Sequence, residues 1–249
     1  MKIIISPAKK MNRDSDTLPA AGLPVFLKDT ERILNWLQGR TYEELKKLWA
    51  CSDAIARQNV ERLRDMDLRA CLTPAILAYE GIQYQYMAPA VFEEDQYRYL
   101  EDHLRILSGF YGVLKPFDGV VPYRLEMQAK TAVDGLNLYD FWGEKLYRET
   151  LDDSRIIVNL ASKEYAKCIA AHLREGDRMI TCQFCERDDK KDRLVQKGVY
   201  VKMARGEMVR FMAREQMEEA EVMKEFTGLD YHFEDSLSSE DSYVFVRRK

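Results

Sequence analysis

The chain has 249 residues, of which 46% are hydrophobic and 11% aromatic, so it holds enough apolar material to bury the core of a globular protein. Its 38 basic and 42 acidic residues give a formal net charge of -4, which argues against non-specific coating of nucleic acid and requires any phosphate partner to meet a local basic patch. Five cysteines at irregular spacings argue against a disulfide framework, and no apolar run approaches the roughly 18 residues of a membrane helix, so we expect a soluble cytoplasmic protein.

The first predicted elements are a short buried strand at residues 2–6 and a long loop at residues 7–24, where Pro, Gly and Asp are scattered. Loops of that length are often functional. From Val25 onward, apolar residues recur at helical spacing and predict a helix. Thr41 and Glu44 have the spacing of a capping box, which predicts the start of a second helix.

The middle of the chain predicts one further strand between helices. Ser52 is placed to cap a third helix. Residues 75–79 form an apolar run that is long enough for a strand and too short for an independent helix. Residues 93–107 predict a helix again.

The following part predicts a strand-to-helix unit and a hairpin. Residues 155–160 predict a strand, and Ser162 directly after it is placed to cap a helix. Residues 179–185 and 199–203 predict two strands on either side of the charged stretch at 186–193, which has the composition of a solvated hairpin tip.

The last predicted elements are a long helix over residues 207–226 and a strand over residues 243–246. Strands alternate with helices from end to end, and the sequence has no internal repeat, low-complexity tract or Gly/Ser linker. We therefore expect a mixed α/β (α+β) fold, in which residues 1–249 form a single compact domain with a mixed sheet and surrounding helices.

The segment LRILSGFYGVLKPFDGVVPYRLEM, at residues 104–127, is rich in residues that shape a backbone or suit a phosphate. Its glycines let a backbone approach a ligand closely, and basic residues stand beside them. Ordinary turns and core aromatics explain the same composition equally well. The residues of interest are Arg105, Gly109, Gly112, Lys115 and Arg124.

This segment resembles the central signature of the YaaA-type peroxide stress response family, and four further segments are similar to that family in the same order. They are IISPAKKM at 4–11, NLYDFWG at 137–143, VNLASKEY at 158–165 and KMARGEMVRFM at 202–212. The resemblance implies a bacterial cytoplasmic protein, induced under hydrogen peroxide stress, that limits iron-driven damage. It also implies DNA binding through a basic cleft in an unusual α/β fold.

The resemblance further implies a helix-hairpin-helix element, in which the backbone N–H groups of a glycine-containing hairpin point at a phosphate. Residues 107–112 are one candidate, because a helix predicted to end near Leu107 fits the first arm. One residue too many separates Gly109 from Gly112, however. Residues 78–82 form a weaker candidate, so the location of the hairpin stays open.

Two other matched segments supply basic residues. Lys9 and Lys10 follow the first predicted strand, at the edge where open α/β sheets bind ligands, although a Lys-Lys pair is more often a solvated surface feature. Lys202 and Arg205 lie where a strand is predicted to give way to a helix, and Arg210 lies on that helix.

Carboxylates in or beside the matched segments offer a second kind of chemistry. Glu126, Glu164 and Glu186 can serve acid–base chemistry on a nucleotide if two of them pair, although such acids more often hold arginines in place. Asn159 and Ser162 bracket a strand-to-helix step, where free N–H groups suit an anion. The sequence does not single out a catalytic set.

Metal and thiol chemistry have little support in the sequence. Cys182 and Cys185 form a lone CxxC in a predicted strand, not at the helix N-terminus that lowers the pKa of a thiol. No second pair completes a zinc site. His103, His172 and His232 are isolated, and the Glu-x-x-His of a di-iron site is absent. We therefore expect no metal and no cofactor.

Three functional hypotheses follow. The first is a DNA-binding protein of the peroxide stress response that contacts the phosphates of double-stranded or structured DNA in one cleft. The second is an enzyme that acts on a nucleotide or a nucleic-acid base, with Glu126 as acid or base, and the third is a redox sensor that uses Cys182 and Cys185. We expect no membrane contact, and no protein partner can be inferred. The first hypothesis uses Gly109, Gly112 and eight basic residues: Lys9, Lys10, Arg105, Lys115, Arg124, Lys202, Arg205 and Arg210.

Overall fold

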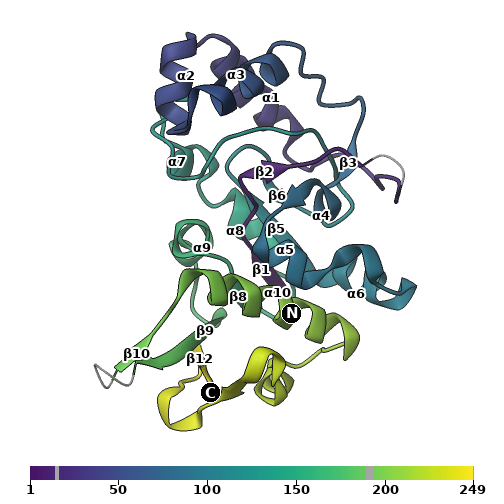
Figure 1. The fold of residues 1–249 in the computed structure, drawn as a ribbon, viewed down its shortest axis with the longest axis vertical. Coiled ribbons are helices and arrows are strands. Elements are labelled where there is room, and N and C mark those ends of the chain that lie inside the picture. Colours follow the sequence, from purple (N-terminus) through teal and green to yellow (C-terminus); the bar gives the residue numbers. More distant parts are fainter. Residues whose placement is uncertain (15–16, 189–192, 249) are drawn as a thin grey trace.

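A computed structural model of the chain describes residues 1–14, 17–188 and 193–248. Its main sheet has eight strands: β1 (Lys2–Ile5), β5 (Leu104–Ser108), β6 (Gly112–Leu114), β8 (Ile156–Leu160), β9 (Arg178–Asp188), β10 (Arg193–Val195), β11 (Tyr231–Phe233) and β12 (Ser242–Arg247). They lie in the order β11-β12-β9-β8-β1-β5-β6, and β10 pairs with β9 (Figure 1). The strands β12, β9, β8, β1 and β5 run parallel, so their carboxyl ends meet at one edge. The expected mixed α/β fold is confirmed.

The strand β1 lies inside the sheet because it is apolar on both faces. Ile3, Ile4 and Ile5 are all fully buried, as expected for a central parallel strand. The chain leaves β1 to form β5 on one side of it and later returns as β8 on the other side. The strand order therefore reverses between β1 and β8, and open α/β sheets usually bind ligands at the carboxyl edge of such a reversal.

Helices and short strands complete the fold. The α-helices are α1 (Leu27–Gln38), α2 (Tyr42–Trp49), α3 (Asp53–Arg64), α4 (Ala75–Ala78), α5 (Ile82–Met87), α6 (Glu94–His103), α7 (Leu138–Trp142), α8 (Lys145–Thr150), α9 (Lys163–Ala170) and α10 (Gly198–Arg214). The 3-10 helices are η1 (Pro89–Val91), η2 (Ala220–Glu225), η3 (Gly228–Asp230) and η4 (Asp235–Leu237). Two small ladders pair β2 (Lys10–Met11) with β4 (Tyr79–Glu80), and β3 (Thr73–Pro74) with β7 (Gly119–Val120).

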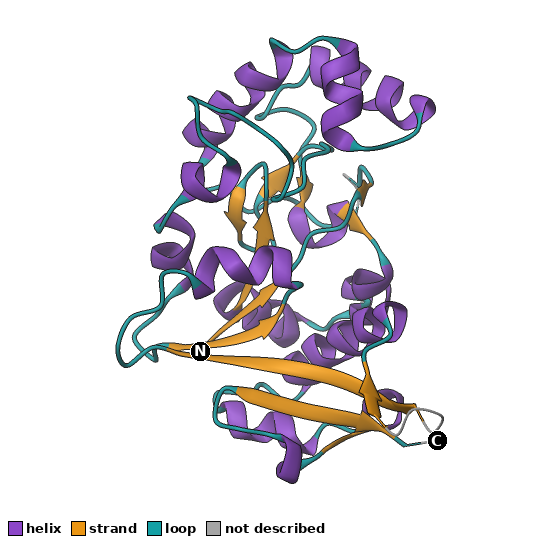
Figure 2. Ribbon diagram, turned by 90° about the vertical axis from the view of Figure 1, so that its left-hand side faces the viewer, coloured by secondary structure: helices purple, strands orange, loops and turns teal. Residues whose placement is uncertain are grey.

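The helices α1, α2 and α3 form a group at one end of the molecule, above the main sheet (Figures 1 and 2). The predicted capping box of α2 is confirmed, because Thr41 Oγ1 accepts a hydrogen bond from the Glu44 N–H while the Glu44 carboxylate accepts one from the Thr41 N–H. Ser52 stands at the N-cap of α3, as predicted, but its side chain makes no capping hydrogen bond. Among the described residues, no helix combines the length and the apolarity needed to cross a membrane.

Two predictions in the middle of the chain were wrong. Residues 75–79 do not form a strand, because the apolar run folds into the single helical turn α4 before the two-residue strand β4. The helix predicted over residues 93–107 ends at His103, because Leu104–Ser108 pairs with β1 as a central strand. Short apolar runs do not distinguish helix from strand, and pairing with β1 decided the second case.

The strand predicted over residues 199–203 was also wrong, since these residues open the helix α10. Val201, Ala204 and Met208 are buried three and four residues apart on one face of that helix. The helix predicted over residues 207–226 ends at Arg214. The strands predicted over residues 155–160, 179–185 and 243–246 are confirmed within one to three residues at each end. Of the predicted hairpin tip, residues 189–192 lie outside the described part of the chain.

Gly206 sets how closely α10 packs on α5. A Cβ atom at this position would lie 2.2 Å from the backbone oxygen of Gln83 and 2.8 Å from the backbone nitrogen of Met87. Glycine is unfavourable inside a helix, and here it allows the two backbones to touch. The segment KMARGEM therefore contains a packing residue between Arg205 and Glu207.

Candidate functional site

A cavity of about 510 Å³ lies at the carboxyl edge of β1 and β8, where the strand order reverses. Ser6 follows β1 and Ser162 follows β8, and both line this cavity. Ser6 Oγ accepts a hydrogen bond from the Ser162 N–H at 2.8 Å and lies 3.2 Å from Ser162 Oγ. These contacts tie the two strand ends together. Ser162 is also the N-cap residue of α9, as predicted, but makes no side-chain capping bond.

Five of the eight predicted basic residues line this cavity, which we call the switch-point cavity. They come from three parts of the chain that are far apart in sequence: the loop and short strand after β1, the loop after β7, and α10. These residues are Lys9, Lys10, Arg124, Lys202 and Arg205. The fold therefore brings together charges from the three segments that carried the predictions.

Three of these five cations are paired with carboxylates of the same cavity. Lys9 Nζ lies 2.8 Å from Glu126 Oε1, and Arg124 lies 3.7 Å from the same oxygen. Lys10 lies on β2 and forms an ion pair with Glu80 on β4, the strand that pairs with β2. Glu126 therefore holds two cations in place, which is the role that such acids most often have.

The two cations from α10 are not paired in this way. Lys202 and Arg205 make no side-chain hydrogen bond or ion pair within the described residues, and Arg205 Nε is buried without a partner. Burial lowers the pKa of the Arg205 guanidinium, which nevertheless stays charged because arginine titrates far above neutral pH. A desolvated guanidinium without a partner is unfavourable until an anion binds to it.

A third carboxylate, that of Glu164, lines the same cavity. Its Oε1 accepts a hydrogen bond from the Gln128 N–H at 3.1 Å. Burial raises the pKa of Glu164, and the nearby charge of Glu126 adds to this effect. The cavity therefore contains a carboxyl group that binds a proton more readily than an exposed glutamate does.

Residues not singled out in the sequence hold α5 against the strand ends. Tyr84 donates its hydroxyl hydrogen to the Ser6 carbonyl at 2.9 Å, and Gln83 donates to the Leu160 carbonyl at 3.3 Å. Both line the cavity, together with Glu80. The only sequence signal near them was the weaker glycine hairpin at residues 78–82, which lies between α4 and α5 with Gly81 in the cavity wall.

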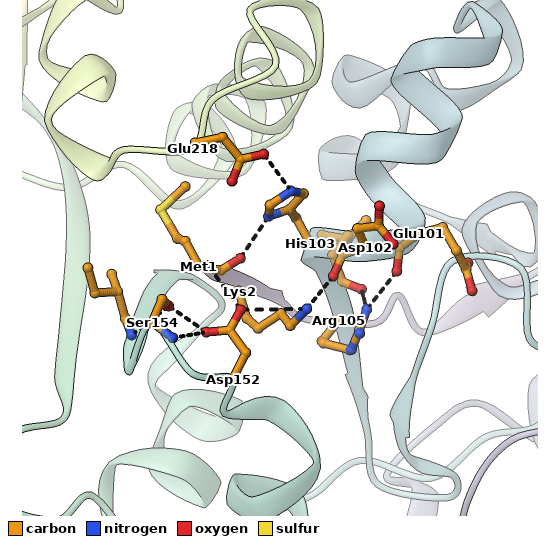
Figure 3. A network of polar contacts seen from close by, with 11 residues as sticks. Met1, Lys2, Glu101, Asp102, His103, Arg105, Asp152, Ser154 and Glu218 are labelled. Atoms are coloured by element: carbon orange, nitrogen blue, oxygen red, sulfur yellow. Dashed lines mark hydrogen bonds and ion pairs between the residues drawn. The ribbon is translucent and has the colours of Figure 1, made fainter.

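Arg105 and Lys115 lie outside this cavity. Arg105 is only 6% exposed on β5, and its Nη1 donates to the carbonyls of Glu101 at 3.0 Å and Leu104 at 2.7 Å (Figure 3). Burial lowers the pKa of Arg105. Lys115 lines a separate cavity that it shares with Glu101 and Asp118. These two residues therefore do not join the other cations, contrary to the prediction of one shared cleft.

Arg210 does not join the other cations either. Its side chain is exposed and lines another cavity, which it shares with Glu93, Glu207 and Arg214. One helical turn separates it from Gly206, beyond the part of α10 that faces the switch-point cavity. The predicted cluster therefore contains five cations and excludes three.

The helix-hairpin-helix element predicted at residues 107–112 was wrong in this position. Leu107 belongs to β5 and Gly112 to β6, so a β-hairpin stands where two helices were required. Gly112 has φ +78°, and a Cβ atom there would lie 2.9 Å from both Trp142 and Leu146. Gly109 is buried, and a Cβ atom would lie 2.9 Å from the Leu125 carbonyl. These glycines serve close packing of the core and are not placed to contact a phosphate.

The thiols of the CxxC pair are buried, as in a structural role. Burial raises the pKa of Cys182 to about 12 and also raises that of Cys185, so both thiols are protonated at neutral pH. The protonated form is a poor nucleophile, which weighs against the redox-sensor hypothesis. Within the described ranges, no three His, Cys, Asp or Glu side chains are grouped as a metal site.

Comparison with known proteins places this geometry in a family context. The sequence profile described as peroxide stress protein YaaA matches residues 1–237. A UPF0246 protein of Agathobacter rectalis is 57% identical over 249 residues, covering 100% of this chain and 99% of the relative. UPF0246 proteins of Desulfitobacterium hafniense and Pediococcus pentosaceus are each 54% identical, with 99% and 100% of this chain and 98% and 99% of the relatives covered.

Proposed function

Because this chain belongs to the peroxide stress protein YaaA family, we propose that it acts in the bacterial response to hydrogen peroxide by binding DNA phosphates in the switch-point cavity. Lys9, Lys10, Arg124, Lys202 and Arg205 are the proposed contacts. Arg105, Lys115 and Arg210 are not part of this proposal, because they lie in other environments.

The observation that carries the proposal is the pair of unpartnered cations on α10. Lys202 and Arg205 face a cavity in which the other three cations already have carboxylate partners. A phosphate is the anion that suits them best, because guanidinium groups bind phosphate oxygens in a bidentate manner and ammonium groups add a point charge. The chain as a whole carries a net charge of -4. The excess of positive charge is therefore local to this cavity and is not a general property of the protein surface.

Phosphate binding also supplies a physical route to protection against iron. The DNA backbone holds a layer of condensed cations, and each phosphate neutralised by a protein cation releases such counterions. A protein bound in this way displaces iron(II) from the DNA that it covers. We propose that peroxide then meets less iron at the DNA, which limits the damage.

The test is the salt dependence of DNA affinity. We expect the affinity of the wild type to fall steeply with salt, and the slope of the log–log plot to decrease by about 2 in the Lys202→Ala/Arg205→Ala double variant. The matched control is the Lys115→Ala/Arg210→Ala double variant, which removes the same number of charges outside the cavity. Absence of DNA binding at about 50 mM salt, or an equal loss in both double variants, would contradict the proposal.

A second candidate function is acid–base catalysis on a nucleotide, favoured by the Glu126 and Glu164 carboxylates in one cavity. The raised pKa of Glu164 suits a proton donor, while Glu126 forms ion pairs with Lys9 and Arg124. Incubation with nucleotides and oligonucleotides, followed by chromatography, would reveal new products. Glu164→Gln and Glu126→Gln should then abolish turnover; identical behaviour of both variants and the wild type would count against catalysis.

A further inference from the structure

A second cavity adjoins the switch-point cavity and has a different character. It measures about 610 Å³, within the range of about 300–1,000 Å³ that is usual for small-molecule sites. Its wall is formed by α1, the end of α2 and the loop at residues 124–130. Lys9, Arg124 and Glu126 line both cavities, so the two spaces share one wall. We call it the tryptophan cavity.

Trp36 and Arg40 give this cavity flat surfaces, and the buried Trp49 lies in its wall. Trp36 lies on α1 and Trp49 at the end of α2. The Arg40 guanidinium lies over the Trp36 ring, 4.9 Å from its centroid. Trp49 is only 4% exposed, yet its indole N–H is buried without a hydrogen-bond partner in the described residues. Aromatic rings and guanidinium planes are the surfaces on which proteins stack unpaired bases.

Cations stand around these aromatic surfaces. Lys47 and Lys130 line the tryptophan cavity, are exposed, and form no ion pair within the described residues. Arg124, in the shared wall, has a buried Nε without a partner. Together with Lys202 and Arg205 in the neighbouring cavity, Lys47 and Lys130 place cations without ion-pair partners in both cavities. Cations beside aromatic surfaces suit a nucleic-acid strand, which carries a phosphate beside each base.

We propose that the tryptophan cavity binds an unpaired base of single-stranded DNA whose adjoining phosphate lies against Lys9 and Arg124. This inference rests on the proposed function, because it assigns the base next to the phosphates of the switch-point cavity. Bases inside an intact duplex are stacked on their neighbours and are not free to enter a cavity, whereas phosphates are exposed in both forms. The protein therefore prefers single-stranded or locally unpaired DNA to a perfect duplex.

The experiment distinguishes the contribution of the base to affinity from that of the phosphate. Fluorescence anisotropy would compare a labelled thymidine oligonucleotide with an abasic oligonucleotide of the same length, which carries the same phosphates and no bases. We expect the wild type to bind the thymidine oligonucleotide about tenfold more tightly, the effect of stacking roughly one base. A duplex of the same length should bind more weakly than the single strand.

Variants then test whether the tryptophan cavity causes the preference for the thymidine oligonucleotide. Trp36→Leu should reduce the preference for bases to less than about twofold, whereas Trp36→Phe, which keeps an aromatic ring, should retain most of it. Lys202→Ala/Arg205→Ala should weaken binding of both oligonucleotides by the same factor, because it removes phosphate contacts only. Lys28→Ala, at an exposed position on α1 that lines neither cavity, is the control for loss of a surface charge and should change neither affinity.

The outcomes distinguish the two proposals. Equal affinity of the wild type for the thymidine and abasic oligonucleotides would overturn the base site and leave phosphate binding intact. Failure of every oligonucleotide and duplex to bind at about 50 mM salt would overturn the proposed function itself. Because the wild-type ratio needs no substitution, a variant that unfolds cannot hide either result, and thermal unfolding of each variant identifies such a case.

Discussion

Arg105 and Arg205 are chemically identical, and burial lowers the pKa of both, yet their surroundings differ. Arg105 donates hydrogen bonds to two carbonyls where α6 gives way to β5. Arg205 lies on α10 in the wall of a cavity, without a hydrogen-bond or ion-pair partner in the described residues. The protein supplies two acceptors for Nη1 of Arg105, although Nε of Arg105 is buried without one, whereas Arg205 has no acceptor among the described residues.

This difference indicates which basic residues of a matched segment are candidates for ligand binding. Position in a characteristic segment does not decide whether a basic residue binds a ligand, because Arg105 belongs to the segment that resembles the family most. The deciding properties are whether the fold supplies partners for the charge and whether the charge faces a cavity. We therefore expect the surroundings of Arg105 to matter for stability and those of Arg205 to matter for binding.

The largest expected effect comes from moving the helix that carries Arg205. In Gly206→Val, the new side chain meets the backbone of α5 at a distance that no real contact tolerates, so α10 must shift. We expect the free energy of unfolding to fall by about 3 kcal/mol or more and DNA affinity to fall with it. Chemical denaturation and anisotropy would measure both quantities.

The control for this change lies on the same helix. A Cβ atom at Gly198, the first residue of α10, meets nothing within 4 Å, so Gly198→Ala should leave binding unchanged and stabilise the helix by at most about 1 kcal/mol. If Gly206→Val were as stable as the wild type, the close packing of α10 on α5 would not position the cavity wall.

Removing each arginine separately should have opposite effects on stability and on binding. Arg105→Met keeps an apolar stem but leaves the carbonyls of Glu101 and Leu104 without their donor, so the free energy of unfolding should fall by about 1–3 kcal/mol while DNA affinity stays unchanged. Arg205→Met should weaken DNA binding by about tenfold without loss of stability, because it removes a buried charge that has no partner. Parallel denaturation and binding curves would check this. An equal loss of DNA affinity in Arg105→Met and Arg205→Met would contradict the different roles of the two arginines.

A pH-dependent effect on stability is expected near Arg105, at Asp118. Burial raises the pKa of Asp118 to about 6, whereas an aspartate in the unfolded chain titrates near about 4. Between those values the folded protein holds more protons than the unfolded chain, so this group makes stability fall as pH rises from about 4 to about 6, with no further change above.

Asp118→Asn should remove this contribution. Its amide oxygen can still accept the hydrogen bond from the Lys115 N–H, so we expect the variant to be more stable than the wild type by about 1–2 kcal/mol at pH 7 and to differ little at pH 4. Asp153→Asn, at an exposed position, is the control. Unfolding curves at several pH values would measure the difference in stability between Asp118→Asn and the wild type. A difference that does not vary with pH would contradict the raised pKa of Asp118.

The smallest effects are expected at the exposed cations that lie outside the switch-point cavity. Lys115→Ala and Arg210→Ala should each change DNA affinity by less than about twofold and the free energy of unfolding by at most about 0.5 kcal/mol. Both side chains are exposed, so solvent and salt screen their charges. A loss of affinity comparable to that of Arg205→Met would extend the site to these residues.

Local patterns predicted some elements well and others poorly. The capping box of Thr41 and Glu44 was predictable because both partners lie within one helical turn. The strand at residues 243–246 was predictable because its apolar run is bounded by polar residues. The strand predicted at residues 199–203 failed because Val199 and Val201 favour strands locally, while the buried face of α10 spans residues beyond that window. The helix ending at His103 was misjudged because β5 exists through its pairing with β1, about a hundred residues away in sequence.

The sequence by itself determined the family, the mixed α/β class and the three segments that supply the cations of the candidate site, because each is carried by residues close together in the chain. Only the tertiary structure decided which cations meet. Lys9, Arg124 and Lys202 converge because β1 and β8 end side by side and α10 packs on α5 through Gly206, whereas Arg105 is turned into the fold. Whether a charge has a partner depends on contacts between distant segments, and such contacts follow from the assembled fold and not from local sequence.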